Sequence, residues 1–433
     1  MKTGVIRSSS VPASRGSGFT TFAALRYRNY RLWFVGQALS LMGTWMQSVA
    51  QGWVVYQITG SRFALGAISF ASTIPTLFLM LPAGAVADRV SRRNLLIWTQ
   101  TAMMLCAFIL TALTATGVLQ VWHVAVLAFA LGVANSFDAP ARQSLAVEMV
   151  EDRRDLMNAI ALNSTMFNLG RVVGPAIGGV VLAALGPAWC FGLNGISFLA
   201  VIGALLGMRL PPRSASNPRE PLVRQIAIGL RYVLSSAPVR TIVLLMAVST
   251  LFGFSYSTLM PAYAVDVLRV GETGLGFLTT SVGIGALVSS LTVASLGHVR
   301  RKGRLLLAGS CLFPAALLGF AFSRSFPLSL ALLAVAGFGF VLQNTTSNTV
   351  VQMLVPDHLR GRVMAVYTLT FFGTMPFGSL LVGSIAQVWG PTAGVAMGAA
   401  VTLACALWIL LAQPAMLRLT VEPSPTLEKD PRS

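Results

Sequence analysis

One arginine, Arg171, lies in the middle of a long apolar stretch, residues 156–208, that holds no other charged side chain. An unpaired charge in an apolar environment is costly, so a residue of this kind is expected to have a specific role. Its guanidinium can bind carbonyl and amide groups as a packing post, or it can receive an anionic group of a ligand. The sequence leaves both alternatives open.

Amide and hydroxyl side chains recur at helical spacing within the apolar stretches. Steps of three and four residues place such side chains on one face of a helix. The longest series is Gln37, Ser40, Thr44, Gln47 and Gln51, and shorter ones are Ser164, Asn168, Arg171 and Asn344, Asn348, Gln352, with Asn135 near the end of a further stretch. Each series can line a polar cavity or form hydrogen bonds between helices, which contribute about 0.6 kcal/mol each in a membrane.

A carboxylate in the middle of an apolar stretch would be a candidate for carrying a proton, but the sequence offers none there. Asp138 and Asp266 lie near the ends of such stretches. Asp138 is the better candidate because it lies beside Asn135. An ion pair with Arg142, four residues further on, explains Asp138 at least equally well.

Residue groups typical of an enzyme are missing from the sequence. The histidines, His123, His298 and His358, are scattered, and there is no Walker A motif and no metal-ligand cluster. We therefore expect neither catalysis nor a cofactor or metal.

The composition predicts a membrane protein. The chain of 433 residues is 55% apolar and 10% charged, against about 25% charge in an average soluble domain. Charge-free runs long enough to span a membrane, divided at Gly186-Pro187 and Gly390-Pro391, predict an all-α fold with twelve transmembrane helices. The expected limits are 31–58, 62–86, 93–115, 119–141, 156–185, 188–209, 239–265, 273–297, 303–322, 326–350, 360–388 and 391–416.

Basic residues outnumber acidic ones, 31 to 13, which gives a net charge of +18. Such a charge alone would suggest nucleic acid, but 27 of the 31 basic residues fall on one side of the twelve spans. The positive-inside rule then places both termini in the cytoplasm, with the basic side facing anionic lipid and no nucleic-acid partner.

A weak repeat at a shift of 204–210 residues relates the two parts of the chain, as Gly186-Pro187 corresponds to Gly390-Pro391. Repeats of six spans each predict two parallel-repeat six-helix halves. The expected divisions are a disordered cytoplasmic tail at 1–29, a half at 30–209, a cytoplasmic linker at 210–237, a half at 238–416 and a second disordered tail at 417–433. The linker is either a plain spacer or a helix at the membrane interface.

The loop between the second and third spans fits G-x-x-x-D-R-x-x-R-R, with Gly84, Asp88, Arg89, Arg92 and Arg93 at its fixed positions. A glycine there allows two helices to approach closely, and the aspartate can pair with arginines or face a helix N-terminus. The motif resembles the loop 2–3 signature of the major facilitator superfamily of secondary transporters, in which it closes the cytoplasmic side of the outward-facing state. The resemblance implies a gating loop; a loop that only sets orientation is the alternative.

The fifth span fits G-x-x-x-G-P-x-x-G-G, with Gly170, Gly174, Pro175, Gly178 and Gly179 at its fixed positions. Small residues at this spacing allow backbones to pack closely, and proline permits a kink. The pattern resembles the antiporter motif of the same superfamily, which is associated with export. A longer form of that motif has another glycine where this chain has Ala161.

Residues 135–144, together with Asn158, Asn163 and Arg171, resemble the branch of bacterial drug and siderophore exporters. The resemblance covers most of residues 25–415 and implies an export protein of the bacterial inner membrane that takes small amphiphilic molecules into a central cavity. It further implies exchange for protons, for which Asp138 is the coupling candidate. We expect a monomer. The implied cavity lining is Gln37, Thr44, Gln47, Gln51, Asn135, Asn168, Arg171, Asn344 and Asn348. An importer of a small metabolite, neutral or anionic, on the same fold is the alternative.

Overall fold

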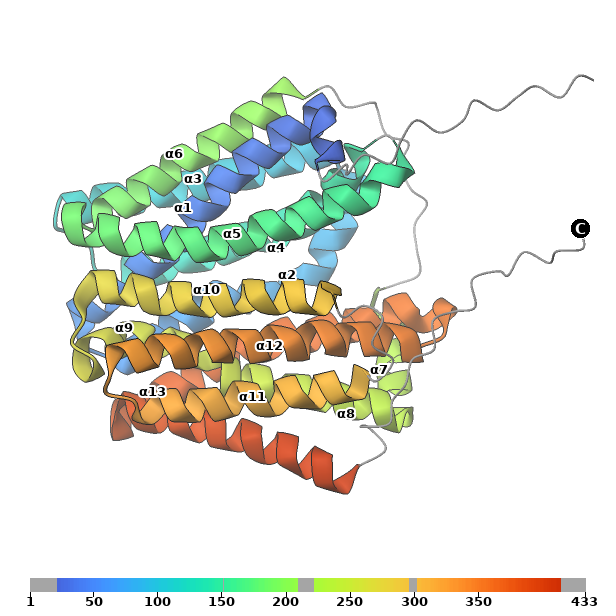
Figure 1. Cartoon of the computed structure of the whole chain (residues 1–433). Coiled ribbons are helices and arrows are strands. Elements are labelled where there is room, and N and C mark those ends of the chain that lie inside the picture. Colours follow the sequence, from blue (N-terminus) through green and yellow to red (C-terminus); the bar gives the residue numbers. More distant parts are fainter. Residues whose placement is uncertain (1–21, 151, 209–221, 296–301, 414–433) are drawn as a thin grey trace, which may run out of the picture.

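The computed structural model describes residues 22–150, 152–208, 222–295 and 302–413, and these residues form helices and turns without a β-strand (Figure 1). Ten of the described helices are long and apolar enough to cross a membrane. Their outer surfaces expose large apolar side chains such as Trp98, Phe78 and Leu411, which suits lipid rather than water. The prediction of an all-α membrane protein is confirmed.

The first helices follow the expected spans closely. They are α1 (Arg28–Thr59), α2 (Arg62–Arg89), α3 (Arg92–Ala115), α4 (Val121–Glu148), α5 (Arg153–Leu185) and α6 (Pro187–Gly207). Local chemistry sets their ends: Gly60 adopts a left-handed conformation with φ 59°, and the side chain of Ser61 then accepts a hydrogen bond from the N–H of Ala64. Gly186, with φ 85°, ends α5 before Pro187 begins α6.

The later helices are joined by an irregular segment. They are α7 (Leu222–Ser235), α8 (Ala237–Val248), α9 (Met260–Ala262), α10 (Gly271–Ser295), α11 (Lys302–Phe322), α12 (Phe326–Leu354) and α13 (Asp357–Ala412). The span expected at 239–265 is not one regular helix, because a π-helical turn, a 3-10 turn and a second π-helical turn follow α8. Pro261 lacks the N–H that would continue a regular hydrogen-bond ladder. Gly390, with φ 86°, divides α13 at the expected Gly-Pro turn.

Of the two tails predicted to be disordered, residues 1–21 and 417–433 lie outside the described residues. The expected disorder is wrong for residues 22–29, where Ala23–Arg26 forms a 3-10 helix. This helix docks on α5, because the N–H of Ala24 donates to Asn158 Oδ1 at 2.9 Å and Arg26 pairs with Asp155. Within the linker, residues 222–235 form α7, and residues 209–221 lie outside the description.

Helices α1–α6, here the first set, pack mainly on one another, as do α8–α13, here the second set. The two sets meet chiefly where α2 packs on α13 and where α5 packs on α10. Figure 1 shows α5 and α10 side by side. We use "basic end" for the end of the bundle that carries the α2–α3 turn and α7, and "opposite end" for the end that carries the α1–α2 and α5–α6 turns. Toward the basic end, at the right of Figure 1, α5 and α10 draw apart.

Candidate functional site

The carboxylate of Asp266 joins the two helix sets at the opposite end. Asp266, in the π-helical turn of Tyr263–Val267, accepts hydrogen bonds from Tyr56 Oη at 2.5 Å and from Arg62 Nη2 at 2.6 Å. Tyr56 lies in the last turn of α1 and Arg62 begins α2, so one oxygen of Asp266 binds two helices of the first set. The Arg62 and Asp266 side chains are 25% and 26% exposed, so solvent screens this pair only in part.

A second contact lies beside the first. Gln387 Oε1, on α13, accepts hydrogen bonds from the main-chain N–H groups of Arg62 at 2.8 Å and Phe63 at 3.2 Å, and from Ser61 Oγ at 3.2 Å. The N–H groups of a first helical turn have no partner within their own helix. Gln387 of the second set therefore caps α2 of the first set and joins the two sets at the opposite end.

The glycine motif of α5 packs on two partners. A Cβ at Gly170, Gly174 or Gly178 would lie 2.6–3.1 Å from an atom of α1. A Cβ at Gly179 would lie 2.8 Å from Gly276 Cα on α10. The close helix packing predicted from the motif is confirmed, and Gly179 extends it across the two sets.

Arg171 lies on α5 between these contacts. Its guanidinium carbon is 5.9 Å from the ring centre of Trp45, and Tyr256 is within electrostatic range. Its main-chain carbonyl approaches α10, since a Cβ at Gly283 would lie 2.8 Å from that oxygen. Arg171 forms no ion pair with Asp138, whose described ion-pair partner is Arg142.

An aromatic cluster borders this region on the second set. Phe254 stacks on Phe340 with ring centres 4.7 Å apart, and Phe340 lies 5.0 Å from Phe313 and 6.4 Å from Phe371. Tyr256, which is 3% exposed, lies 6.4 Å from Phe313 and is near enough to Arg171 to interact with it electrostatically. The sequence did not indicate this cluster, because phenylalanine in an apolar span has no signal that separates a binding surface from core packing.

The polar series of α1 divides between two environments. Gln47 is 5% exposed, and its Oε1 accepts a hydrogen bond from Asn194 Nδ2 of α6 at 2.7 Å. The predicted cavity role of Gln47 is therefore wrong for this structure, because the side chain faces a helix of its own set. Gln37 is also buried, with its Oε1 unpartnered, whereas Thr44 is exposed and donates to the Ser40 carbonyl.

We predict that Gln47→Leu lowers the stability of the folded transporter by about 1 kcal/mol and leaves substrate selectivity unchanged, because it removes one hydrogen bond between helices. A double-mutant cycle with Asn194→Leu, followed by thermal unfolding in detergent, measures the coupling between the two side chains. A change in the range of exported compounds with normal stability would contradict the packing role.

Asp138 is held entirely within the first set. It is 1% exposed and accepts hydrogen bonds from Thr99 Oγ1 at 3.0 Å and Gln100 Nε2 at 2.8 Å. Arg142 Nε lies 3.4 Å from its second oxygen, so the expected ion pair is confirmed. All of these partners belong to α3 and α4.

The gating motif lies at the basic end. Arg92 pairs with Glu148 across α3 and α4, and Arg93 donates to the carbonyls of Leu205 at 2.6 Å and Leu206 at 2.9 Å. These carbonyls end α6, which a cation stabilises. Arg89 is exposed, and the side chain of Asp88 lies outside the description. A Cβ at Gly84 would meet nothing within 4 Å, so the expected close approach is absent in this structure, where the sets separate at the basic end.

The remaining predicted residues keep local partners. Asn168 Nδ2 donates to the Ser164 carbonyl at 2.9 Å, and Asn348 Oδ1 accepts from Gln352 Nε2 at 2.5 Å. Asn135 is exposed, whereas Gln51 and Asn344 are partly buried.

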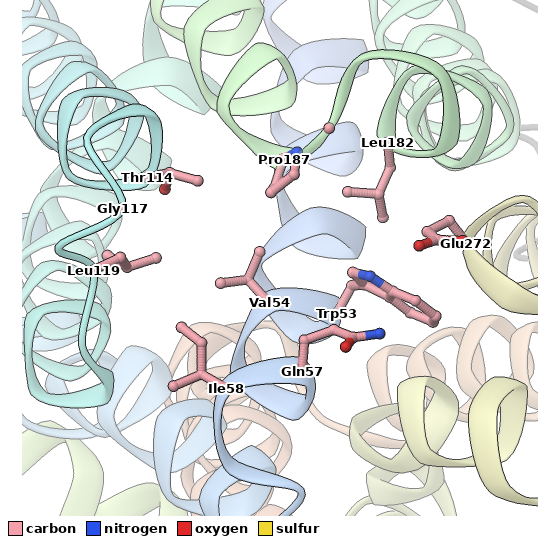
Figure 2. A pocket seen from close by; sticks show the side chains of 11 residues that line it. Trp53, Val54, Gln57, Ile58, Thr114, Gly117, Leu119, Leu182, Pro187 and Glu272 are labelled. Carbon is pink, nitrogen blue, oxygen red and sulfur yellow. The ribbon is translucent and has the colours of Figure 1, made fainter.

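Two described cavities lie apart from these residues. Figure 2 shows the first, of about 420 Å³ at the opposite end, with Trp53, Gln57 and Glu272 around it. The second, of about 340 Å³ between α1 and α6, has an apolar lining that includes Leu39 and Ile196. None of the site residues predicted from the sequence lines either cavity.

Comparison with known proteins decides the family. Residues 19–431 match the sequence model of the major facilitator family described as "Transmembrane secretion effector". The chain belongs to this family. The resemblance to the drug and siderophore exporter branch is confirmed, and the protein is a multi-pass membrane transporter rather than an enzyme.

Relatives in this family match over nearly their whole length. The multidrug efflux pump Tap of Mycolicibacterium fortuitum is 30% identical over 363 residues, which cover 80% of this chain and 87% of that protein. The staphyloferrin A transporter of Staphylococcus aureus is 25% identical, covering 83% and 90%, and the enterobactin exporter EntS of Shigella boydii is 27% identical, covering 84% and 86%.

Solved transporter structures share the fold. A POT family transporter in complex with 5-aminolevulinic acid superposes with a TM-score of 0.71 at 14% identity, covering 90% of this chain and 96% of that one. A bacterial homologue of the lysosomal transporter Spinster, solved in an inward-facing and unoccupied conformation, gives a TM-score of 0.67 at 14% identity, covering 91% and 97%.

Proposed function

We propose that this transporter is a secondary active exporter of small amphiphilic molecules, drugs or siderophore-like metabolites, that works by alternating access. The observation that carries the proposal is the uneven contact between the two helix sets. Asp266 and Gln387 tie them together at the opposite end, whereas α5 and α10 separate at the basic end (Figure 1). This arrangement suits the state of an alternating-access cycle in which the transporter is closed at the opposite end and open at the basic end. The glycine motif of α5 and the efflux relatives support export rather than import.

The proposed architecture is twelve transmembrane helices in two six-helix halves around a central cavity. Ten candidate spans, the additional helix α1 and the division of α13 at Gly390 support this count. The first and second sets would be the halves, and both termini would lie in the cytoplasm of a bacterium with the transporter in its inner membrane. The closed, opposite end would then face outward.

The proposed cavity lining keeps the predicted residues apart from Gln47. It consists of Gln37, Thr44, Gln51, Asn135, Asn168, Arg171, Asn344 and Asn348. The loop from Gly84 to Arg93 would close the basic end in the other state. We further propose that the transporter is a monomer and that α7, whose Arg224, Leu230, Arg231 and Leu234 are exposed, rests against anionic lipid.

We expect export to be driven by exchange for protons. In cells loaded with a panel of amphiphilic compounds, expression of the transporter should lower the retained compound, and an uncoupler should abolish the difference. Export that persists with an uncoupler would contradict proton exchange but not export. Accumulation on expression, in place of depletion, would favour an importer.

A further inference from the structure

We propose that Arg171 binds the anionic group of the transported molecule, so that the transporter selects amphiphilic anions over organic cations. This inference rests on the proposed export function and specifies that the exported molecule carries a negative charge. It resolves the two alternatives for Arg171 that the sequence leaves open.

The guanidinium of Arg171 has no acidic partner among the described residues. The carboxylates that form described ion pairs all pair with other arginines: Asp138 with Arg142, Asp155 with Arg26, Asp266 with Arg62, Glu148 with Arg92 and Asp357 with Arg360. An unpaired charge in a low-dielectric interior is costly, and an anionic ligand removes that cost when it binds.

The alternative role for Arg171 is structural, in which the guanidinium donates hydrogen bonds to carbonyl groups and so holds helices together. Arg93 has this role, and Arg171 differs from it. The guanidinium of Arg93 donates to two carbonyls at the end of α6, at 2.6 and 2.9 Å. The guanidinium of Arg171 makes no hydrogen bond to a described carbonyl or amide, and its described neighbours are the Trp45 ring and Tyr256. At 5.9 Å the Trp45 ring lies at the limit of a cation–π contact and leaves the N–H donors free. Arg171 therefore keeps its donors available for a ligand.

The surroundings of Arg171 suit the rest of an amphiphile. Trp45 lies on one side. On the second set, Phe254 and Phe371 are partly exposed, and the other members of the cluster, Tyr256, Phe313 and Phe340, are buried against them or beside them. Aromatic faces bind flat apolar groups with little loss of conformational entropy. A molecule with one anionic group and an aromatic or apolar body would then contact both helix sets. Organic cations find no described carboxylate beside these side chains, since Asp138 is enclosed between α3 and α4 and Asp266 lies at the opposite end.

The test compares two dyes of similar body and opposite charge, fluorescein as the anion and rhodamine 123 as the cation, in inverted membrane vesicles that carry an imposed proton gradient. We expect wild-type vesicles to accumulate fluorescein in preference. Arg171→Gln should lower the ratio of fluorescein to rhodamine transport about tenfold or more, and Arg171→Lys should restore part of it because the charge remains. Arg360→Gln is the control, because Arg360 is exposed on α13 and pairs with Asp357, and it should leave this ratio unchanged.

Thermal unfolding of the same variants in detergent separates a ligand-binding role from packing. Arg171→Gln should leave the melting temperature unchanged or raise it, because an unpaired charge is removed. A lower melting temperature with equal loss of both dyes would show a packing role and overturn the proposal.

Preferential transport of rhodamine, unaffected by Arg171→Gln, would overturn the proposal while export stands. Transport of neither dye, with no inhibition by them of a known exported compound, would refute the anion site, whereas failure to export any compound of the wider panel would refute the export function itself.

Discussion

Gly276→Val is expected to abolish transport while the protein still folds. A Cβ at Gly276 would lie 2.7 Å from both Gly179 Cα and the Pro175 carbonyl oxygen, which belong to the other helix set. Backbone atoms cannot move aside locally, so the two sets must separate at the opposite end. Overpacking of this kind costs about 3 kcal/mol, which shifts a balanced two-state equilibrium about a hundredfold toward the form open at that end.

Distances between spin labels at Thr116 and Val388 measure this shift, because both positions are exposed at the opposite end and belong to different sets. In Gly276→Val the distance distribution should move to longer values, and dye export should fall to the level of control vesicles. Wild-type distances together with wild-type transport would contradict movement of the two sets against each other.

Two other glycines serve as controls for this substitution. A Cβ at Gly285 would lie 1.8 Å from the Ala334 carbonyl oxygen, within the second set, so Gly285→Val should prevent folding instead of shifting an equilibrium. Gly203 lies in α6, and a Cβ there would meet nothing within 4 Å, so Gly203→Val should be harmless. The yield of monodisperse protein in detergent distinguishes the three variants.

The fold was predictable from the sequence where local chemistry decides it. Local sequence, within a few residues, sets the turn at Gly186-Pro187 and the break at Gly390 between charge-free runs. The structure has both breaks where the sequence predicts them. The irregular helix after α8 was not predicted, since its apolar composition equals that of a regular span and only Pro261 hints at the break.

The candidate site was predictable only in part, because helical spacing defines a face and not what that face meets. Gln47 shares a face with other polar residues of α1, but Asn194 of α6 is its partner. Arg62 and Asp266 are separated by 204 residues, so their pairing depends on how the two sets pack. Arg171 could be recognised in the sequence because the free-energy cost of a charge inside the membrane depends only on its position in the span. A charge far from either end of a span therefore needs an explanation, however the helices pack.

Asp266→Asn is also expected to shift the transporter toward the form that is open at the opposite end. Gly276→Val does so by steric overlap, whereas Asp266→Asn does so by loss of a charge. The substitution removes the ion pair with Arg62 and weakens the hydrogen bond from Tyr56, since an amide oxygen is a weaker acceptor than a carboxylate. The side chains are about one quarter exposed, so we expect a combined effect of about 2 kcal/mol, or about thirtyfold in the conformational equilibrium. The label distance between Thr116 and Val388 should lengthen, and export should slow because the closed form is populated less.

The partner substitution tests whether the pair, and not the residue alone, holds this end. Arg62→Gln should lengthen the same distance, and the double variant should add little to either change, since each substitution already breaks the contact. Asp357→Asn is the control, because its pair with Arg360 is exposed and lies within one helix turn of α13. Additive effects of Asp266→Asn and Arg62→Gln would mean that the two side chains act separately. In that case Gln387, whose amide oxygen binds the same turn through main-chain groups, would be the contact that keeps the transporter closed at this end.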